Sequence, residues 1–388
     1  MKILYVISCN GAGRGGHNHS LDHISKAIAQ NANVKIISIG LTESPILKEN
    51  PNYYGAFKFR WFSYFTLGKK FKELFKTFNP DIIHCFDGSS ALMLLALPGL
   101  ITKKIIYTKC GGPNERKSIA QVTSDVFLFS QENYDSYKSN PRFKGSDLHL
   151  IPNRVFEVDL WEEKKREILK DDNVFNFVRI ARIGESYENS IKQAIELTSR
   201  VNILDKKVKL YVIGVIQEED IFIELSKFAN NKKIDVQFIT NHLTEKASRM
   251  LYLADAVIGT GRGVMEAMSL GLPTFVPVKG KDLPELLTPE NFHKFLSTNF
   301  SPRGVSESYD EAEIVSKVNS LVKNSQTYNE SSAFALSMAN EEFVVNKEIV
   351  SKYISIYKDI SLKKNKLYIL NNIIPFLYYL NAFRRAQS

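Results

Sequence analysis

Short apolar runs alternate with amphipathic segments through most of the chain. In the first half, runs typical of buried strands lie at residues 2–8, 34–39, 82–85, 105–108 and 126–129. Helical patterns at 19–30 and 69–78 separate them, and a charged stretch at 161–173 interrupts this rhythm. Strand-like runs then return at 175–180, 209–213, 236–239, 256–258 and 274–278. Strands that alternate with helices are typical of parallel sheets. We therefore predict an α/β protein with two Rossmann-like domains that face each other across a cleft.

The expected domain boundaries follow from this pattern. We place the first domain at residues 1–155, the second at 173–345 and a C-terminal segment at 346–388. Residues 331–360 have a helical pattern, and the chain after them is aromatic and basic. Asn371, Asn372 and Pro375 in this tail argue against a helix that spans a membrane.

Composition narrows the class of protein. Of the 388 residues, 44% are hydrophobic and 24% charged, which excludes a disordered or collagen-like chain. No apolar run reaches the roughly 20 residues of a membrane-spanning helix, and the first residues do not form a signal-peptide pattern. Cys9, Cys85 and Cys110 lack metal-ligand spacing, so we expect neither disulfides nor zinc. These features predict a soluble, cytoplasmic protein.

The net charge of +9 is concentrated at the start of the chain. Residues 1–155 contain 20 Lys and Arg against 11 Asp and Glu, whereas the remainder contains 31 of each. A basic surface favours nucleic acid, an anionic membrane or a phosphorylated substrate, although a charge excess that keeps the protein soluble explains it equally well. We find no motif typical of RNA or DNA binding, so we expect no nucleic-acid partner.

A basic and aromatic stretch at residues 58–76 suits an anionic membrane surface. We predict membrane contact by Arg60, Trp61, Lys69 and Lys70. The alternative is a buried amphipathic helix whose lysines face water.

A glycine-rich turn at residues 11–16 follows the first strand and precedes a helix. It formally matches G-x-G-x-x-G, in which glycines let backbone N–H groups approach a phosphate. The second strand ends at Gly40 without the acidic residue that holds a dinucleotide's ribose. The turn therefore predicts either a phosphate site or a purely structural turn.

A second glycine-rich turn, within residues 254–273, carries more chemistry. Its three glycines are Gly259, Gly261 and Gly263. They leave the N-terminus of the next helix open to an anion, and Arg262 adds a positive charge there. Glu266, one turn further on, suits a pair of sugar hydroxyls as an acceptor. The alternative is that Arg262 and Glu266 are partners on the helix surface.

The segment ADAVIGTGRGVMEAMSLGLP resembles the donor-site segment of family 4 glycosyltransferases, which have the GT-B fold. Four other parts are similar in the same order: Gly15-Gly16 to the family's Gly-Gly loop, residues 80–84 to its PDIIH strand, residues 150–153 to its IPNG turn, and residues 181–183 to its GRL segment. The resemblance covers about residues 2–350. It implies that a UDP- or GDP-linked sugar is bound by Gly15, Gly16, Arg182, Gly261, Arg262, Gly263 and Glu266.

The chain departs from the family pattern at three functional positions. Ile258 replaces the first glutamate of the family's E-x7-E motif, and no basic residue follows Arg182 at the usual distance, so we expect Arg262 to supply that charge. Lys109 begins the segment that replaces a first-domain histidine. We therefore predict that Lys109, Asp87 and Glu115 activate or position the acceptor.

The resemblance implies a retaining transfer from a nucleotide-sugar to a glycan or lipid-linked acceptor in capsule, O-antigen or exopolysaccharide synthesis. The acceptor would bind the basic first domain, and the helix at 346–360 would cross back to that domain. No Asp-x-Asp lies at a strand end, so we expect neither a metal nor a further cofactor. A GT-B-shaped epimerase, a Rossmann dehydrogenase and a membrane-associated scaffold that binds without turnover are the alternatives.

Overall fold

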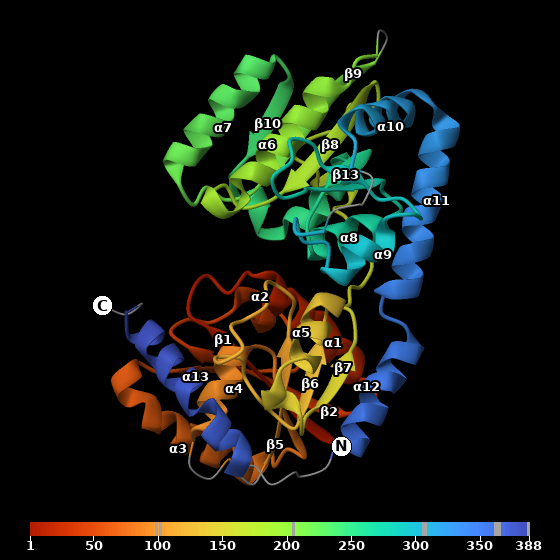
Figure 1. Cartoon of the computed structure of the whole chain (residues 1–388). Helices are drawn as coiled ribbons and strands as arrows, with labels where there is room; N and C mark the ends of the chain where they lie inside the picture. The colour runs from red at the N-terminus through yellow and green to blue at the C-terminus, as the bar shows by residue number, and fades with distance from the viewer. Residues whose placement is uncertain (98–99, 101–102, 204–205, 305–308, 361–365, 386–388) are drawn as a thin grey trace. The chain divides into compact units, whose positions relative to one another are not determined.

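The computed structural model describes the chain except residues 98–99, 101–102, 204–205, 305–308, 361–365 and 386–388. The chain divides into two compact units (Figure 1). Residues 1–154 and 345–388 form the first unit, and residues 155–344 form the second. Each unit is an α/β structure built on its own sheet, which confirms the predicted fold class.

The sheet of the first unit is entirely parallel, with strand order β3-β2-β1-β4-β5-β6-β7. Its strands are β1 (Lys2–Cys9), β2 (Asn33–Gly40), β3 (Tyr53–Lys58), β4 (Ile82–Cys85), β5 (Lys104–Lys109), β6 (Asp125–Leu128) and β7 (Asp147–Leu150). Its helices are α1 (Gly16–Ile28), α2 (Pro45–Lys48), α3 (Tyr64–Thr77), α4 (Gly88–Leu95), α5 (Gln131–Lys138), α12 (Lys347–Asp359) and α13 (Lys366–Arg385). The order reverses between β1 and β4, which is where ligands bind in open α/β sheets.

The sheet of the second unit has the order β10-β9-β8-β11-β12-β13, and only its β12–β13 pair is antiparallel. Its strands are β8 (Val174–Ile180), β9 (Lys207–Ile213), β10 (Asp235–Ile239), β11 (Ala256–Ile258), β12 (Thr274–Val276) and β13 (Glu285–Leu286). Its helices are α6 (Glu185–Arg200), α7 (Glu219–Lys232), α8 (Arg262–Ser269), α9 (Phe292–Ser297), α10 (Glu311–Lys323) and α11 (Ser325–Glu342), with a 3-10 segment, η4 (His242–Leu253). Here the order reverses between β8 and β11.

Alternating side chains explain how the first sheet is covered on both faces. In β1, Leu4 and Val6 point into the main hydrophobic cluster, which α3, α4 and α13 complete. Tyr5 points to the other face, where its hydroxyl bonds that of Tyr357 on α12 at 2.8 Å. The Tyr357 hydroxyl also bonds His84 Nδ1 at 2.7 Å. This buried network fixes α12 to the centre of the sheet.

Every strand that the sequence predicted is present, with ends within two residues of those expected. The sequence missed β3, β7 and β13. It also placed the start of α3 too late, because the aromatic residues from Tyr64 onward belong to the helix. The region 331–360 is helical but divided between α11 and α12, where Asn346 caps the second helix through the Ile349 N–H at 2.9 Å.

Candidate functional site

The candidate site lies in the second unit, at the carboxyl ends of β8 and β11. The turn after β8 carries Arg182 and leads into α6, and the turn after β11 carries Gly261 and leads into α8. These strands are neighbours at the reversal of strand order. Residues that are about eighty positions apart in the sequence therefore belong to one edge of one sheet.

A cavity of about 830 Å³ runs from this edge along α6. Its wall comes from α6 as far as Arg200, from Phe228 and Lys232 on α7, from Thr260 in the turn after β11, from the loop after β12 and from Pro302. The described residues that line it include Ser186, Tyr187, Asn189, Lys192, Lys279, Gly280 and Lys281. A volume of this size is within the range of pockets that hold cofactors and drug-sized ligands.

Arg182 is exposed at the start of this region. Its Nη2 donates to the Tyr187 hydroxyl at 3.0 Å, and its guanidinium lies 5.1 Å from the centre of that ring. The backbone of Arg182 is set by close packing, because a β-carbon on Gly214 would lie 1.7 Å from the Ala181 carbonyl oxygen. Only glycine at position 214 permits this approach.

The α8 turn combines a helix N-terminus that lacks a side-chain cap with an ion pair. Gly261 is the N-cap and has a φ of 52°, a conformation that favours glycine. The Gly263 and Val264 N–H groups bond the carbonyls of Thr260 and Gly261 at 3.1 and 3.2 Å. Arg262 Nε lies 2.8 Å from Glu266 Oε1, and only 9% and 14% of these side chains are exposed. The structure thus realises the pairing that the sequence left open as an alternative.

A buried arginine that the sequence analysis did not single out lies beneath the site. Arg179 in β8 donates to the Ile258 carbonyl at 3.3 Å and to Ser190 Oγ at 2.7 Å. Complete burial lowers the pKa of Arg179 to about 10. It therefore joins β8, β11 and α6 while it keeps a positive charge below the cavity.

The loop after β12 was also missed, although Lys279-Gly280-Lys281 directly after a predicted strand was a usable signal. Gln193 on α6 holds this loop. Its Nε2 donates to the carbonyls of Val278 at 2.6 Å and Lys281 at 2.8 Å, and its Oε1 accepts from the Val278 N–H at 2.9 Å. A buried side chain thus fixes the loop that brings two lysines to the cavity.

The other predicted residues lie in the first unit. Gly15 is the N-cap of α1 and Gly16 is the first residue of that helix, so the glycine-rich turn does precede a helix N-terminus. The side chains that follow β2 hold the turn, with Thr42 Oγ1 on the Gly11 carbonyl at 2.5 Å and Ser44 Oγ on the Gly13 carbonyl at 2.7 Å.

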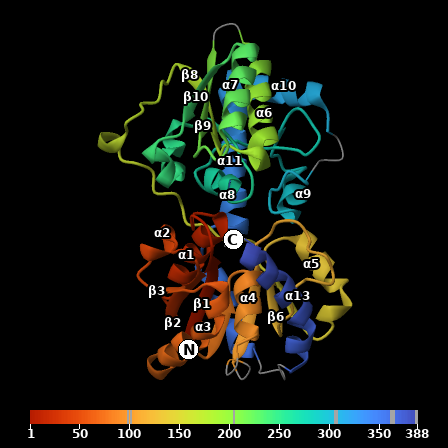
Figure 2. The ribbon, with the colours of Figure 1, turned by 90° about the vertical axis from the view of Figure 1, so that its left-hand side faces the viewer.

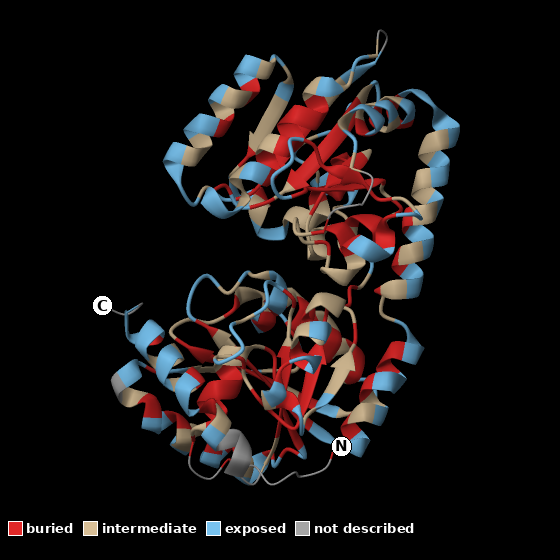
Figure 3. Cartoon of the chain, viewed as in Figure 1, coloured by how far each residue is buried: buried red, intermediate tan, exposed pale blue. Residues whose placement is uncertain are grey.

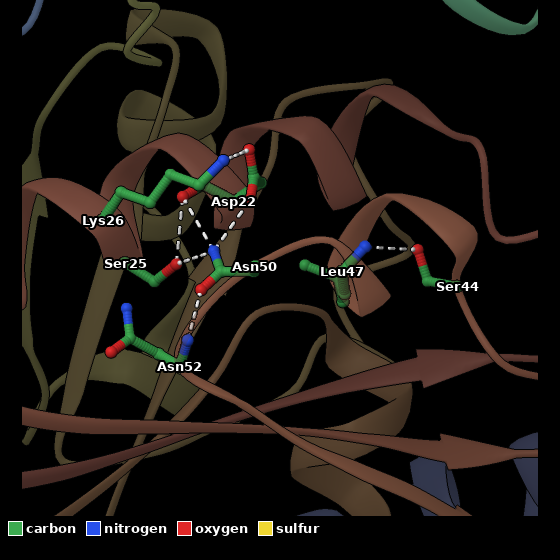
Figure 4. A network of polar contacts seen from close by, with 7 residues as sticks. All are labelled: Asp22, Ser25, Lys26, Ser44, Leu47, Asn50 and Asn52. Carbon is green, nitrogen blue, oxygen red and sulfur yellow. Dashed lines mark hydrogen bonds and ion pairs between the residues drawn. The ribbon is translucent and has the colours of Figure 1, made fainter.

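The region after Ser44 is in turn fixed to α1 (Figure 4). The buried Asn50 donates to Asp22 Oδ1 at 2.7 Å and to Ser25 Oγ at 3.0 Å, while Lys26 pairs with Asp22 at 2.8 Å. The α1 turn is therefore set by a polar network between α1 and the α2–β3 connection.

The three predicted acceptor-side residues lie at the ends of β4 and β5. Asp87 uses both carboxylate oxygens on backbone N–H groups, Oδ1 on Ser90 at 2.7 Å and Oδ2 on Ser8 at 2.6 Å. Lys109 Nζ pairs with Glu115 Oε1 at 3.1 Å, with 13% and 23% of the side chains exposed. Asp87 thus caps α4 and joins it to β1, whereas the Lys109–Glu115 pair remains partly open to solvent.

Among the described residues, no group of three or more His, Cys, Asp or Glu side chains is placed to hold a metal ion. In the same part of the chain, no helix is long and apolar enough to cross a membrane. Of the predicted membrane residues, Arg60, Trp61 and Lys69 are exposed, and Lys70 donates to the Lys58 carbonyl at 2.8 Å.

Comparison with known proteins gives relatives in structure alone. No protein-family model and no curated protein matches the sequence. Anabaena HepE in complex with UDP and glucose superposes with a TM-score of 0.63 and 15% identity, over 92% of this chain and 98% of that one. A glycosyltransferase from Rickettsia africae and the sucrose-phosphate synthase of Thermosynechococcus elongatus each give 0.63 and 13% over the same shares. Together with the two α/β units, these similarities show that the chain has the GT-B fold.

Proposed function

We propose that this chain is a glycosyltransferase that moves a sugar from a nucleotide-sugar to a glycan or lipid-linked acceptor. The observation that carries the proposal is the cavity that begins at the β8/β11 edge and is lined by Lys192, Lys279 and Lys281. The Arg182 guanidinium bonds Tyr187, which lines the cavity, and the Arg262–Glu266 pair follows the lining residue Thr260 in the turn after β11. The bound UDP in the complex of HepE, a structural neighbour, supports a nucleotide-sugar as the ligand.

In this proposal the diphosphate of the donor lies near Arg182 and the first turn of α8. As the bond between the anomeric carbon and the diphosphate oxygen breaks, negative charge grows on the leaving group. Arg182, Arg262 and the positive N-terminal end of the α8 dipole face the diphosphate once the donor is bound, so they stabilise that charge without a further change of position. The acceptor hydroxyl forms the new bond to the anomeric carbon and passes its proton to the departing diphosphate oxygen.

Glu266 has two tasks in this scheme. In the free protein it neutralises Arg262 inside a nearly buried pair. When a donor is bound, Arg262 turns its charge toward the diphosphate, and the Glu266 carboxylate accepts hydrogen bonds from sugar hydroxyls. We propose retention of anomeric configuration by attack on the same face, and surface polysaccharide as the product class.

Calorimetry with UDP, GDP, their common sugar conjugates and NAD tests this function. We expect one nucleotide-sugar to bind, and Arg182→Ala and Glu266→Ala each to weaken it at least about tenfold, because each removes a charged contact. Glu313→Ala, which removes the i,i+4 partner of Lys317 on α10, is the matched control and leaves binding unchanged. Chromatography of the products then separates transfer from epimerisation.

Other outcomes would contradict the proposal. Binding of NAD that both site variants leave intact would instead assign a dinucleotide to the turn after β1. Nucleotide-sugar binding without transfer to any polysaccharide or lipid-linked acceptor would indicate a scaffold.

A further inference from the structure

The C-terminal helix α13 is apolar on both of its sides. Its inner side packs on the first unit, where Phe376 contacts Tyr64 at 5.7 Å and Phe383 contacts Phe59 at 5.4 Å between ring centroids. Asn372 fixes the helix further: its side chain accepts from the Val122 N–H at 3.0 Å and donates to the Val122 carbonyl at 2.7 Å. Both views place α13 beside α4 (Figures 1 and 2).

The opposite side of α13 is open to solvent. Five large apolar residues form what we call the α13 outer face: Leu370, Ile373, Ile374, Leu377 and Tyr378. Their exposed fractions run from 45% to 66%. The spacing i, i+3, i+4, i+7 and i+8 places them on one stripe of the helix. Exposed positions recur along α13 (Figure 3). A contiguous apolar stripe of this size at the surface indicates a site of interaction.

Positive charge lies at the C-terminal end of the stripe. Arg384 and Arg385 are exposed at the end of the helix, which contains no acidic residue. In the same unit, Trp61 and Phe65 are exposed aromatic residues, 44% and 75% respectively, and Lys69 is an exposed cation. The first unit as a whole contains 28 Lys and Arg against 13 Asp and Glu, a net charge of +15.

We propose that the α13 outer face docks the first unit on an anionic lipid bilayer. The helix lies in the plane of the headgroups, with its outer face among the acyl chains and its arginines on the lipid phosphates. The helix is not placed across the bilayer, because Asn372, Phe376 and Phe383 on its inner side pack against the rest of the first unit. This inference rests on the surface of the first unit and goes beyond the proposed sugar transfer.

Co-sedimentation of the full chain with vesicles tests the docking. We expect binding to phosphatidylcholine vesicles that contain phosphatidylglycerol and much weaker binding to phosphatidylcholine alone. Ile374→Ser with Leu377→Ser is expected to lower the partition at least about tenfold, because two aliphatic side chains no longer enter the apolar phase. Arg384→Gln with Arg385→Gln is expected to cost about fivefold for each arginine, and only on the anionic vesicles.

A matched control uses exposed apolar residues on helices of the second unit. Ile223→Ser with Leu336→Ser removes side chains that are 45% and 44% exposed and is expected to leave vesicle binding unchanged. Because the outer-face residues do not support the core, unfolding midpoints and nucleotide-sugar binding stay as in the parent protein. Failure of docking and failure of the proposed function are thus separable.

Two results would overturn the proposal. One is equal partition of the parent protein and the outer-face variant. The other is a dimer in sedimentation analysis that the outer-face variant converts to monomer, without vesicle binding by either, which would assign the face to a second copy of the chain.

Discussion

The two units share one architecture but carry opposite net charges. The first has a net charge of +15, whereas the second, with 23 Lys and Arg against 29 Asp and Glu, has −6. The cavity that we assign to an anionic donor nevertheless lies in the acidic unit. That cavity has a local group of cations: Lys279 and Lys281 line it, and Arg182 bonds its lining residue Tyr187. The net charge of a unit determines how it is attracted to an extended charged surface such as a bilayer. Binding of a small ligand depends instead on the few charged side chains next to it.

The turns after the first strand of each unit are built alike. In the second unit Gly214 packs against Ala181, and in the first unit a β-carbon on Gly40 would lie 2.4 Å from the Cys9 carbonyl oxygen. In both turns a glycine therefore packs directly against a backbone carbonyl of the preceding strand end. Only the turn in the second unit carries a cation that we assign to the donor.

Replacing these two glycines is expected to have the largest effect. Gly214→Ala and Gly40→Ala each force backbone atoms apart, and we expect each to destabilise its own unit by about 3 kcal/mol. Gly214→Ala also displaces Arg182 and abolishes nucleotide-sugar binding, whereas Gly40→Ala leaves that binding measurable. Calorimetry of both variants, with urea unfolding, checks the contrast.

The chain's two tryptophans allow each unit to be followed separately. Trp61 lies in the first unit and Trp161 in the second, so a Phe replacement of one leaves the other as a fluorescent reporter. Gly68→Ala in α3, where the new methyl meets Leu97 at an ordinary 3.8 Å, is the control and is expected to be neutral or slightly stabilising. Equal loss of donor binding in both glycine variants would contradict the assignment of the donor to the second unit.

Each unit has a partly buried ion pair near the carboxyl edge of its sheet, Arg262–Glu266 in the second and Lys109–Glu115 in the first. Glu266→Gln is expected to weaken binding of the nucleotide-sugar at least about tenfold and that of the free nucleoside diphosphate less, because the carboxylate is assigned to the sugar. Glu115→Gln is expected to leave both affinities unchanged and to lower turnover at saturating donor about a hundredfold. Calorimetry and initial rates separate the two. Reversal of this pattern would exchange the roles of the two carboxylates.

The sequence predicted most of the fold because short apolar runs are local signals. It missed β3, whose residues are mostly half-buried and include Gly55, and β13, which has two residues. In the second unit it singled out Arg182 and Glu266 because each belongs to a contiguous motif.

What it missed at the site depends on contacts between distant residues. Gln193 fixes one wall of the cavity through hydrogen bonds to a loop eighty-five residues later in the sequence. One carboxylate oxygen of Asp87 accepts a hydrogen bond from the N–H of Ser8, seventy-nine residues earlier. The spacing of residues along the sequence does not predict hydrogen bonds between positions so far apart. The partners of a side chain at the site therefore could not be predicted from the local sequence.

The most gradual effect that we predict separates the units by their response to acid. Burial lowers the pKa of His84 in the first unit from 6.5 to about 3. Below pH 6.5 the unfolded chain therefore binds a proton that the folded chain does not. The stability of the first unit is fully present above that pH and falls as pH drops toward 3, by at most about 1.4 kcal/mol per pH unit from this group.

Urea unfolding of the Trp161→Phe variant between pH 7 and pH 4 measures this slope through Trp61. His84→Gln is expected to be less stable at pH 7, because Thr108 and Tyr357 lose part of their hydrogen bonding, yet to have a flatter slope because no imidazole remains to be protonated. Tyr357→Phe is the control. It removes the hydroxyl that bonds His84, at a cost of about 1 kcal/mol, but it keeps the histidine, so the dependence of stability on pH is expected to be unchanged. An unchanged slope in His84→Gln would place the acid sensitivity of the first unit in its carboxylates, and the difference between the units would then come from net charge alone.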